Sequence, residues 1–469
     1  MRRLMRLLEV NKMFLLSAGR CLLGSLVFFV LLTFHPPSHA IEMTRSVAMI
    51  GEASIADSCN QLGALTWQPT LGQSSIPPPD ALRPIKGKPF RDPILGTCLV
   101  RFTHHDIEPP RGFARNDYSR RQAFNADSTR ALIVALDGAW HLYDAMSMEH
   151  LRKIEALGGD VEPQWHPKEP DLLYFVPRNG VGMKLYELTV SMSRTRLVAD
   201  FGARIRDIWP GANAVWTRSE GSPSADLRYW AFQVDNASWQ GLGMFTYDMQ
   251  TDSILATYDF VKNGKTRPDH LSMSPTGEYV VVSWNEGPVV FSRNLTNPRP
   301  IAKRGEHSDI ALNVAGEDVY VSVDYDKRGG PVYMINLKTG ARTDLFDSYI
   351  GSTATAMHFS GKSYARPGWV VISTYADTDK GGRLQQILGQ SGYQWLHRKV
   401  FIIELSANPT IVNLAFHHSQ YAEYWTEPQA STNRDLTRIL FNSNWGTASK
   451  TDVDTFMVVL TRDWKRVKK

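Results

Sequence analysis

Cysteine is scarce in this sequence: three residues among 469, at positions 21, 59 and 98. This number and spacing exclude a cysteine-built metal site and a CxxC redox pair. Once the N-terminal segment containing Cys21 is set aside, Cys59 and Cys98 are the two that remain. In an oxidising compartment they could form a disulfide that clamps an N-terminal extension, or they could stay as two thiols. The sequence leaves both alternatives open.

Nucleotide-binding and common hydrolase motifs are also absent, since the chain has no glycine-rich phosphate loop, no HExxH and no GxSxG. A basic surplus is missing as well. Five of the 52 basic residues and one of the 47 acidic residues lie within 1–40, which leaves 47 against 46 for the rest. Because a protein that coats a polyanion needs a basic surface, nucleic acid is not an expected partner.

The one long apolar run lies near the N-terminus, from Cys21 to Phe34. It follows a basic start and precedes Ser38-His39-Ala40, whose small residues suit a signal-peptidase site. The run is shorter than the roughly 20 residues needed to span a bilayer. We therefore predict a signal peptide at residues 1–40, a periplasmic or secreted protein, and no stable membrane insertion after cleavage. A retained N-terminal anchor is the alternative.

A strand–turn–strand pattern dominates the rest of the chain. Its clearest copy is HLSMSPTGEYVVVSWN, His270–Asn285, where Pro275 and Gly277 suit a tight turn and the second half is β-branched and aromatic. Six further stretches share the layout: Phe124–Leu136, Trp165–Val176, Gly221–Val234, Leu312–Tyr325, Phe359–Tyr375 and Ala430–Trp445. Repeats of strands at this spacing are typical of a propeller.

We therefore predict an all-β fold, a seven-bladed β-propeller over residues 96–469, preceded by an irregular N-terminal arm at 41–95 that is rich in proline. The stretch Thr97–Thr103 is a further predicted strand, placed to complete the last blade and close the ring. A long insertion at about Asp377–His397 in the sixth repeat is expected to form a wall or lid.

Polar residues recur just before or at the first strand of each repeat. In a propeller those strands line the central channel, so such residues should meet at one mouth. Four of the histidines are at these positions: His166, His270, His307 and His358. The other candidates are Arg120, Arg121, Gln122, Asp160, Glu162, Gln164, Arg218, Glu220, Arg267, Asp269, Glu306, Asp309, Thr355, Glu427 and Gln429. Such a set could bind a metal or perform acid–base chemistry.

Several of these residues have a structural alternative. His166 begins a His-Pro turn that it could simply cap, and His141 is mid-strand in the first repeat, where it could be packed. Arg267 and Arg328 are in loops beside Pro268 and Gly329. The pair His417-His418 is expected in a surface connection without a role.

The motifs PQWHPKEPDLLYF and DHLSMSPTGEYVVVSW, within an exported chain of seven repeats, resemble those of TolB-type or WD40-like propellers. Among these, residues 95–469 are most similar to the bacterial propeller polysaccharide lyases, of the oligogalacturonate lyase and ulvan lyase type. The resemblance implies cleavage of an acidic, uronate-containing glycan by β-elimination, in which a histidine acts as base and an arginine or divalent metal neutralises the carboxylate.

Carried onto this sequence, the resemblance implies His166 or His270 as base, with His141 as a further candidate, and Arg267 or Arg328 as the neutralising group. It implies His307, His358 and Gln429 as ligands of a divalent ion such as Mn, Ca or Zn. The closely spaced histidine pair of pectate-type members is missing here. We expect a monomer acting on an acidic polysaccharide or oligosaccharide. The alternative is a non-catalytic TolB-like propeller that binds a protein partner in the periplasm.

Overall fold

The computed structural model describes residues 55–62, 67–108, 111–351, 353–378 and 393–461. The predicted signal peptide at 1–40 lies outside these residues, as does most of the predicted insertion. Among the described residues, the α-helices are α2 (Ile55–Gln61) and α3 (Gly202–Ile208), and the 3₁₀ turns are Arg178–Gly180 and Tyr424–Thr426. No helix in these ranges has the length and apolar character needed to cross a bilayer.

Almost all regular structure is antiparallel sheet, because β-branched and aromatic residues fill the strands while glycine and proline punctuate the turns. Gly277 illustrates the turns: it has φ +77°, and its N–H donates to the carbonyl of Ser274 at 2.9 Å. This turn connects β16 (His270–Met273) to β17 (Tyr279–Trp284), so the most regular repeat in the sequence forms the predicted hairpin. The all-β prediction is confirmed.

Five sheets are separate units. In chain order they contain β8 (Gln164–Trp165), β9 (Leu172–Phe175), β10 (Lys184–Thr189) and β11 (Arg194–Asp200); β12 (Ala212–Trp216), β13 (Tyr229–Asn236), β14 (Gly241–Asp248) and β15 (Ser253–Asp259); β16 (His270–Met273), β17 (Tyr279–Trp284), β18 (Gly287–Ser292) and β19 (Arg299–Pro300); β20 (Ser308–Leu312), β21 (Asp318–Val323), β22 (Pro331–Asn336) and β23 (Arg342–Asp347); and β24 (Ala354–Ser360), β25 (Trp369–Thr378), β26 (Lys399–Glu404) and β27 (Ile411–Phe416), with β1 (Thr70–Leu71) paired to β27.

A sixth sheet has nine strands and joins the two ends of the chain. Its strands are β2 (Phe90–Arg91), β3 (Cys98–Arg101), β4 (Ala114–Arg115), β5 (Arg130–Ala135), β6 (Ala139–Asp144), β7 (His150–Gly158), β28 (Ser431–Thr432), β29 (Arg438–Ser443) and β30 (Asp454–Val459). One parallel pair, Asp454 with Ala114, links β4–β7 to the other five strands. If these two parts are counted as separate blades, they and the five separate sheets make seven blades. Because this count depends on dividing the nine-stranded sheet, the seven-bladed architecture stays a prediction.

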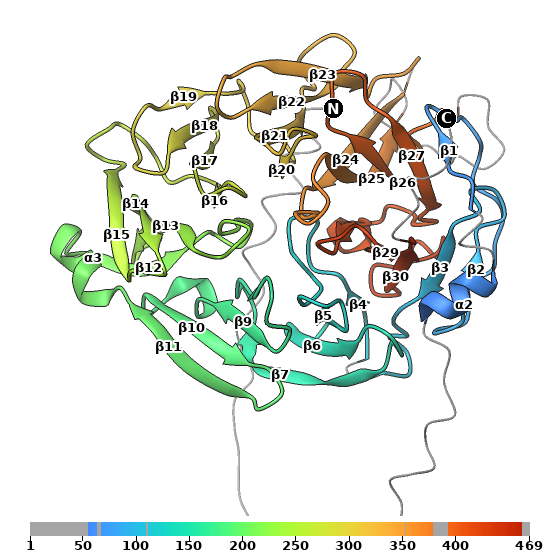
Figure 1. Ribbon diagram of the computed structural model, residues 1–469, viewed down its shortest axis with the longest axis horizontal. Coiled ribbons are helices and arrows are strands. Elements are labelled where there is room, and N and C mark those ends of the chain that lie inside the picture. The colour runs from blue at the N-terminus through green and yellow to red at the C-terminus, as the bar shows by residue number, and fades with distance from the viewer. Residues whose placement is uncertain (1–54, 63–66, 109–110, 352, 379–392, 462–469) are drawn as a thin grey trace, which may run out of the picture. The chain divides into compact units, whose positions relative to one another are not determined.

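Within the unit that begins at Ile55, the sheets follow one another around a centre, with β7, β11, β15, β19 and β23 on the outside (Figure 1). Apolar clusters fill the space between neighbouring sheets. One of them packs Phe201, Phe232 and Phe245 between the β8–β11 and β12–β15 sheets. Because each sheet packs against the next, the start of each inner strand is held in a fixed position.

The ring is closed by β3, which pairs antiparallel with β30 from Cys98–Val459 to Arg101–Phe456. This confirms the prediction that Thr97–Thr103 completes the sheet of the C-terminal strands. An N-terminal strand thereby covers an edge that would otherwise expose unpaired backbone groups.

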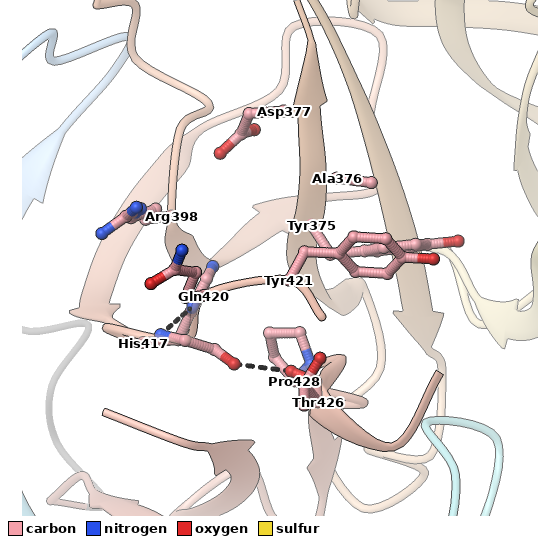
Figure 2. A pocket seen from close by; sticks show the side chains of 10 residues that line it. Tyr375, Ala376, Asp377, Arg398, His417, Gln420, Tyr421, Thr426 and Pro428 are labelled. Carbon is pink, nitrogen blue, oxygen red and sulfur yellow. Dashed lines mark hydrogen bonds between the residues drawn. The ribbon is translucent and has the colours of Figure 1, made fainter. Parts of the chain in front are cut away.

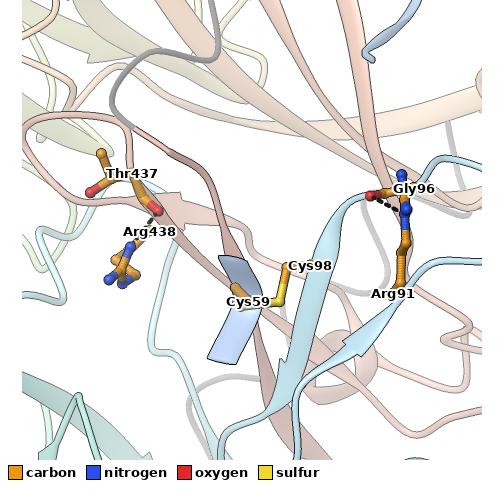
Figure 3. The surroundings of a disulfide bond; sticks show 6 residues. All are labelled: Cys59, Arg91, Gly96, Cys98, Thr437 and Arg438. Atoms are coloured by element: carbon orange, nitrogen blue, oxygen red, sulfur yellow. Dashed lines mark hydrogen bonds between the residues drawn. A yellow bond between two sulfur atoms is a disulfide. The ribbon is translucent and has the colours of Figure 1, made fainter. Parts of the chain in front are cut away.

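The N-terminal arm is more ordered than predicted. Besides α2 it contains β1, which extends the β24–β27 sheet, and β2, which pairs with β3. Cys59 of α2 and Cys98 of β3 form a buried disulfide (Figure 3). The cross-link joins residues 39 positions apart, so it restricts the unfolded chain and clamps the arm to the closing strand. Of the two alternatives that the sequence left open, the structure shows the disulfide.

Candidate active site

Arg120 is at the point where several sheets meet. Its side chain is only 6% exposed, so its guanidinium needs partners. Nη1 donates to Oε2 of Glu220 at 2.9 Å and contacts the ring of His270, while Nη2 donates to Oγ of Ser308 at 3.3 Å. Glu220 follows β12, and the other two residues begin β16 and β20. The predicted convergence of distant strand starts is therefore present around one arginine.

The acidic side of this cluster consists of Glu220 and Asp269. His270 Nδ1 is 3.6 Å from Oε2 of Glu220 and 3.4 Å from Oδ2 of Asp269. Burial acts to raise the pKa of Asp269, but the hydrogen bond and charge of His270, with the nearby charges of Arg218 and Arg120, lower it overall. The Asp269 side chain is 61% exposed, so this acidic edge faces solvent.

A group of histidines and tyrosines adjoins Arg120. The Oη of Tyr118 is 3.1 Å from Nδ1 of His307, and the ring centroids of His307 and His358 are 4.4 Å apart. The ring of Tyr375 stacks on His358 at 4.6 Å with an interplanar angle of 10°. Tyr118 lies in the segment before β5, His307 directly precedes β20, and His358 and Tyr375 belong to β24 and β25, so the rings form a second point of convergence.

His307 has the properties of a base. Burial first, then the neighbouring His358 and the charge of Arg120, lower its pKa well below the usual histidine value, so the ring is neutral at neutral pH. Burial raises the pKa of Tyr118 well above its usual value, so its hydroxyl stays protonated. In the tautomer that carries the proton on Nδ1, His307 donates to Tyr118 and leaves the Nε2 lone pair available.

Three residues were predicted to hold a metal, and the structure brings two of them, His358 and Gln429, close to Glu427, whereas His307 contacts Tyr118 and the ring of His358. His358 Nε2 is 2.8 Å from Oε2 of Glu427, and Gln429 Nε2 donates to the same oxygen at 3.0 Å. The side chain of Gln429 is fully buried, and its Oε1 has no hydrogen-bond partner in the part of the chain described here. Imidazole, carboxylate and amide oxygen are suitable donors for manganese or zinc, so these residues fit a divalent ion.

Two other groups of described residues have three donor atoms within 4.8 Å of one another: Glu220, Asp269 and His270, and His105, Asp452 and Asp454. In each group one of the carboxylates is already paired with the guanidinium of an arginine. Arg120 bonds Glu220, and Arg101 Nη2 is 2.6 Å from Oδ2 of Asp454. Because an arginine already supplies the positive charge, both groups fit a metal ion less well than the residues around Glu427.

Of the residues predicted to act as base, the structure places His270 in the Arg120 cluster and the other two elsewhere. His166 Nδ1 accepts the backbone N–H groups of Lys168 and Glu169, at 3.1 and 2.8 Å, so it caps its turn. His141 is in β6, where Nδ1 contacts His150 at 2.9 Å and Nε2 is 3.3 Å from Asp137.

Neither of the predicted neutralising arginines joins the cluster. Arg267 forms a two-point ion pair with Asp235, with Nε–Oδ1 and Nη2–Oδ2 distances of 3.0 and 2.8 Å. Asp235 is fully buried and also accepts the indole N–H of Trp216 at 2.7 Å. Arg328 is exposed in the turn between β21 and β22. The arginine at the centre of the cluster is Arg120, which the sequence had placed among the wider set of mouth positions.

A hollow of about 240 Å³ lies beside the aromatic group, lined by Tyr375, Ala376, Asp377, Arg398, His417, Ser419, Gln420, Tyr421, Thr426 and Pro428 (Figure 2). The sequence did not single out its lining. His417 was expected in a surface connection, and this is wrong because its side chain is 2% exposed. The burial of His417 could have been predicted from the apolar end of β27, because this strand directly precedes His417 and is buried.

No protein-family model matches this sequence, and no curated protein matches it. Solved structures do. An oligogalacturonate lyase in complex with manganese matches with a TM-score of 0.54 and 14% identity, over 85% of this chain and 99% of that one. An oligogalacturonate lyase from Vibrio parahaemolyticus matches with a TM-score of 0.53 and 11% identity, over 84% and 98%. At this identity the similarity establishes a propeller-lyase-like fold.

The ion pair of Arg267 gives a test of its role. Arg267→Ala leaves the buried carboxylate of Asp235 without its cation, so we expect a loss of about 2–4 kcal/mol in the free energy of unfolding. Arg328→Ala is the matched control, because removing an exposed loop arginine should change stability by less than about 0.5 kcal/mol. Urea unfolding measures both, and equal stabilities of the two variants would contradict a structural role for Arg267.

Proposed function

We propose that this protein is an exported polysaccharide lyase that cleaves a uronate-containing acidic glycan by β-elimination. The observation that carries the proposal is a neutral, half-buried His307, held by Tyr118 and adjacent to the Arg120 cluster at the centre of the ring. The structural similarity to two oligogalacturonate lyases supports it as a likeness of fold. Export, the periplasmic or secreted location and a monomeric state are part of the proposal and come from the sequence.

The reaction requires a base, a cation and an acid. In our proposal Nε2 of His307 takes the proton from C5 of the uronate, a C4–C5 double bond forms, and the bond from C4 to the leaving oxygen breaks. The positive charge of Arg120 stabilises the negative charge that develops beside the uronate carboxylate. This assigns the base to His307, which the resemblance had implied as a metal ligand, in place of His166 or His270.

Tyr375 is suited to supply the proton to the leaving oxygen. Its ring centroid is 6.1 Å from that of His307, and its ring lines the adjacent hollow. Burial first, with the charge of Glu427, raises the pKa of Tyr375 well above its usual value, so the hydroxyl carries a proton to give. The base and the acid would thus act from two sheets, His307 just before β20 and Tyr375 in β25.

A divalent ion held by His358, Glu427 and Gln429 would add a Lewis acid that polarises the uronate carboxylate. His358 and Glu427 would then be oriented by the contact that they already share, and Gln429 would offer its buried Oε1. Manganese is present in one of the similar lyase structures, and which ion this chain prefers is left to titration.

Release of unsaturated uronate ends tests the proposal directly, because they absorb in the ultraviolet as the new double bond forms. Anionic glycans, polygalacturonate and its oligomers first, are the substrates to screen. We expect His307→Ala to lower the rate by about 10²- to 10⁴-fold, as for loss of a general base. His166→Ala is the matched control and should retain the wild-type rate, since His166 caps a turn outside the cluster.

Two results would count against the lyase. One is the absence of unsaturated ends from every uronate polymer, which would favour the non-catalytic binding propeller instead. The other is an active His307→Ala variant.

The pH dependence of kcat/KM gives a separate test of the base. His307 must be neutral to accept a proton, and its pKa in the folded protein is below the ordinary 6.5. Activity should therefore persist as the pH falls through 6.5 and decline only below it, because protonation removes the lone pair. A decline centred at pH 6.5 or above in the wild-type profile would contradict this assignment.

A further inference from the structure

The hollow beside the catalytic cluster is built from three segments of one sheet. Ala376 and Asp377 are at the end of β25, Arg398 directly precedes β26, and His417 and Tyr421 follow β27. In Figure 2, Asp377 and Arg398 lie above His417, with the ring of Tyr421 across from them. Its volume of about 240 Å³ exceeds the roughly 150 Å³ of a cavity that holds benzene, so a six-membered sugar ring fits.

The backbone around this hollow is strained. Ala376, Arg398 and His418 have φ of 49°, 54° and 52°, the left-handed region that residues with a Cβ rarely adopt. Each is at a strand end or in a connection of the same sheet. A strained backbone conformation of this kind persists when the surrounding structure enforces it, and such conformations are common at ligand-binding sites.

His417 lines this hollow with a neutral ring. Its Nδ1 accepts the backbone N–H of Ser419 at 2.9 Å, so the ring proton is on Nε2. Burial first, and then the charge of Arg398, lower the pKa of His417 well below the usual value, although the carbonyl of Thr374 acts to raise it. The ring is therefore neutral. Nε2 is buried on the side of the Thr374 carbonyl, so His417 forms part of the wall of the hollow.

Arg398 supplies a cation. It is half-buried, and among the residues that the structure describes no carboxylate lies within ion-pair distance, 4.0 Å, of its guanidinium. Asp377 influences it electrostatically, but its Oδ1 accepts the hydroxyl of Thr355 at 3.0 Å. Burial raises the pKa of Asp377 to about 7, so near neutral pH this carboxyl carries only part of a negative charge.

We propose that this hollow is a subsite that binds the carboxylate of a uronate residue, with the guanidinium of Arg398 as the donor. The arginine fork matches a carboxylate, and the neighbouring Asp377 disfavours a doubly charged phosphate. Tyr375, Tyr421 and Pro428 provide flat or apolar surface for the faces of the sugar ring. The inference rests on the proposed function in one respect, which is that the uronate belongs to the glycan being cleaved.

Tyr375 connects the subsite to the proposed chemistry. It lines the hollow and stacks on His358, and its ring centroid is 6.0 Å from that of Tyr421. A uronate in the hollow would therefore have its neighbour in the chain close to His307. The subsite thus selects a glycan with two adjacent uronates, and single uronates or alternating neutral units should be poor substrates.

Binding of D-galacturonate, followed by titration calorimetry or ligand NMR, tests the subsite, with D-galactose as the neutral sugar. Arg398→Gln should weaken galacturonate binding by roughly tenfold or more, since it removes charge-assisted hydrogen bonds. Arg398→Lys keeps the charge without the fork and should fall between the two. Arg328→Gln is the matched control, because it removes an exposed arginine far along the chain from the hollow, and it should bind as the wild type does.

Each outcome separates this inference from the proposed function. Arginine-dependent galacturonate binding without any unsaturated ends would keep the subsite and reject the lyase. Release of unsaturated ends with the same kcat/KM for Arg398→Gln would keep the lyase and reject the subsite. The subsite is also overturned if the wild-type protein shows no saturable binding of galacturonate, if galactose binds equally well, or if inorganic phosphate competes as strongly as galacturonate.

Discussion

The centre of this molecule depends on one buried cation. The guanidinium of Arg120 can remain charged in that position only because Glu220, His270 and Ser308 surround it. Burial acts to lower the pKa of Arg120, but the charge of Glu220 together with Tyr118, Asp309 and Tyr320 raises it above its usual value. His270 and Ser308 begin two different sheets and Glu220 follows the first strand of a third, so these contacts fix how the sheets approach one another. The same charge lowers the pKa of His307 and so connects the fold to the proposed base.

The sequence predicted what repetition and strand chemistry determine. The hairpins, the closing strand at 97–103 and the meeting of His270, His307 and His358 follow from the position of each residue relative to an inner strand. The repeat pattern did not predict in which direction each side chain points. Arg267 precedes the inner strand β16 and His166 directly follows the inner strand β8, yet His166 caps its own turn and Arg267 bonds Asp235. Which partner a polar group finds depends on contacts across sheets, and a single sequence does not record them.

Two arginines in the structure have contrasting surroundings. Arg120 is neutralised by Glu220 within its own cluster, whereas Arg398 has no carboxylate at ion-pair distance among the described residues. In our account the first arginine organises the catalytic centre, and the second provides affinity for the substrate. Glu220 and Asp269 are each paired with a cation, Arg120 and Arg218 respectively, so neither faces a bound polyanion as an uncompensated charge. Tyr375 links the His307 and Arg398 regions, since it lies beside His307 and lines the hollow.

The most direct test of the central claim is a double-mutant cycle for Arg120 and Glu220, measured as free energies of unfolding. If the guanidinium joins the sheets through this carboxylate, Arg120→Met should cost about 3–5 kcal/mol. The cost of the double variant with Glu220→Gln should be smaller than the sum of the single costs by at least about 1 kcal/mol. Single effects that add to within about 0.5 kcal/mol would show that the two residues act independently, and would contradict the account.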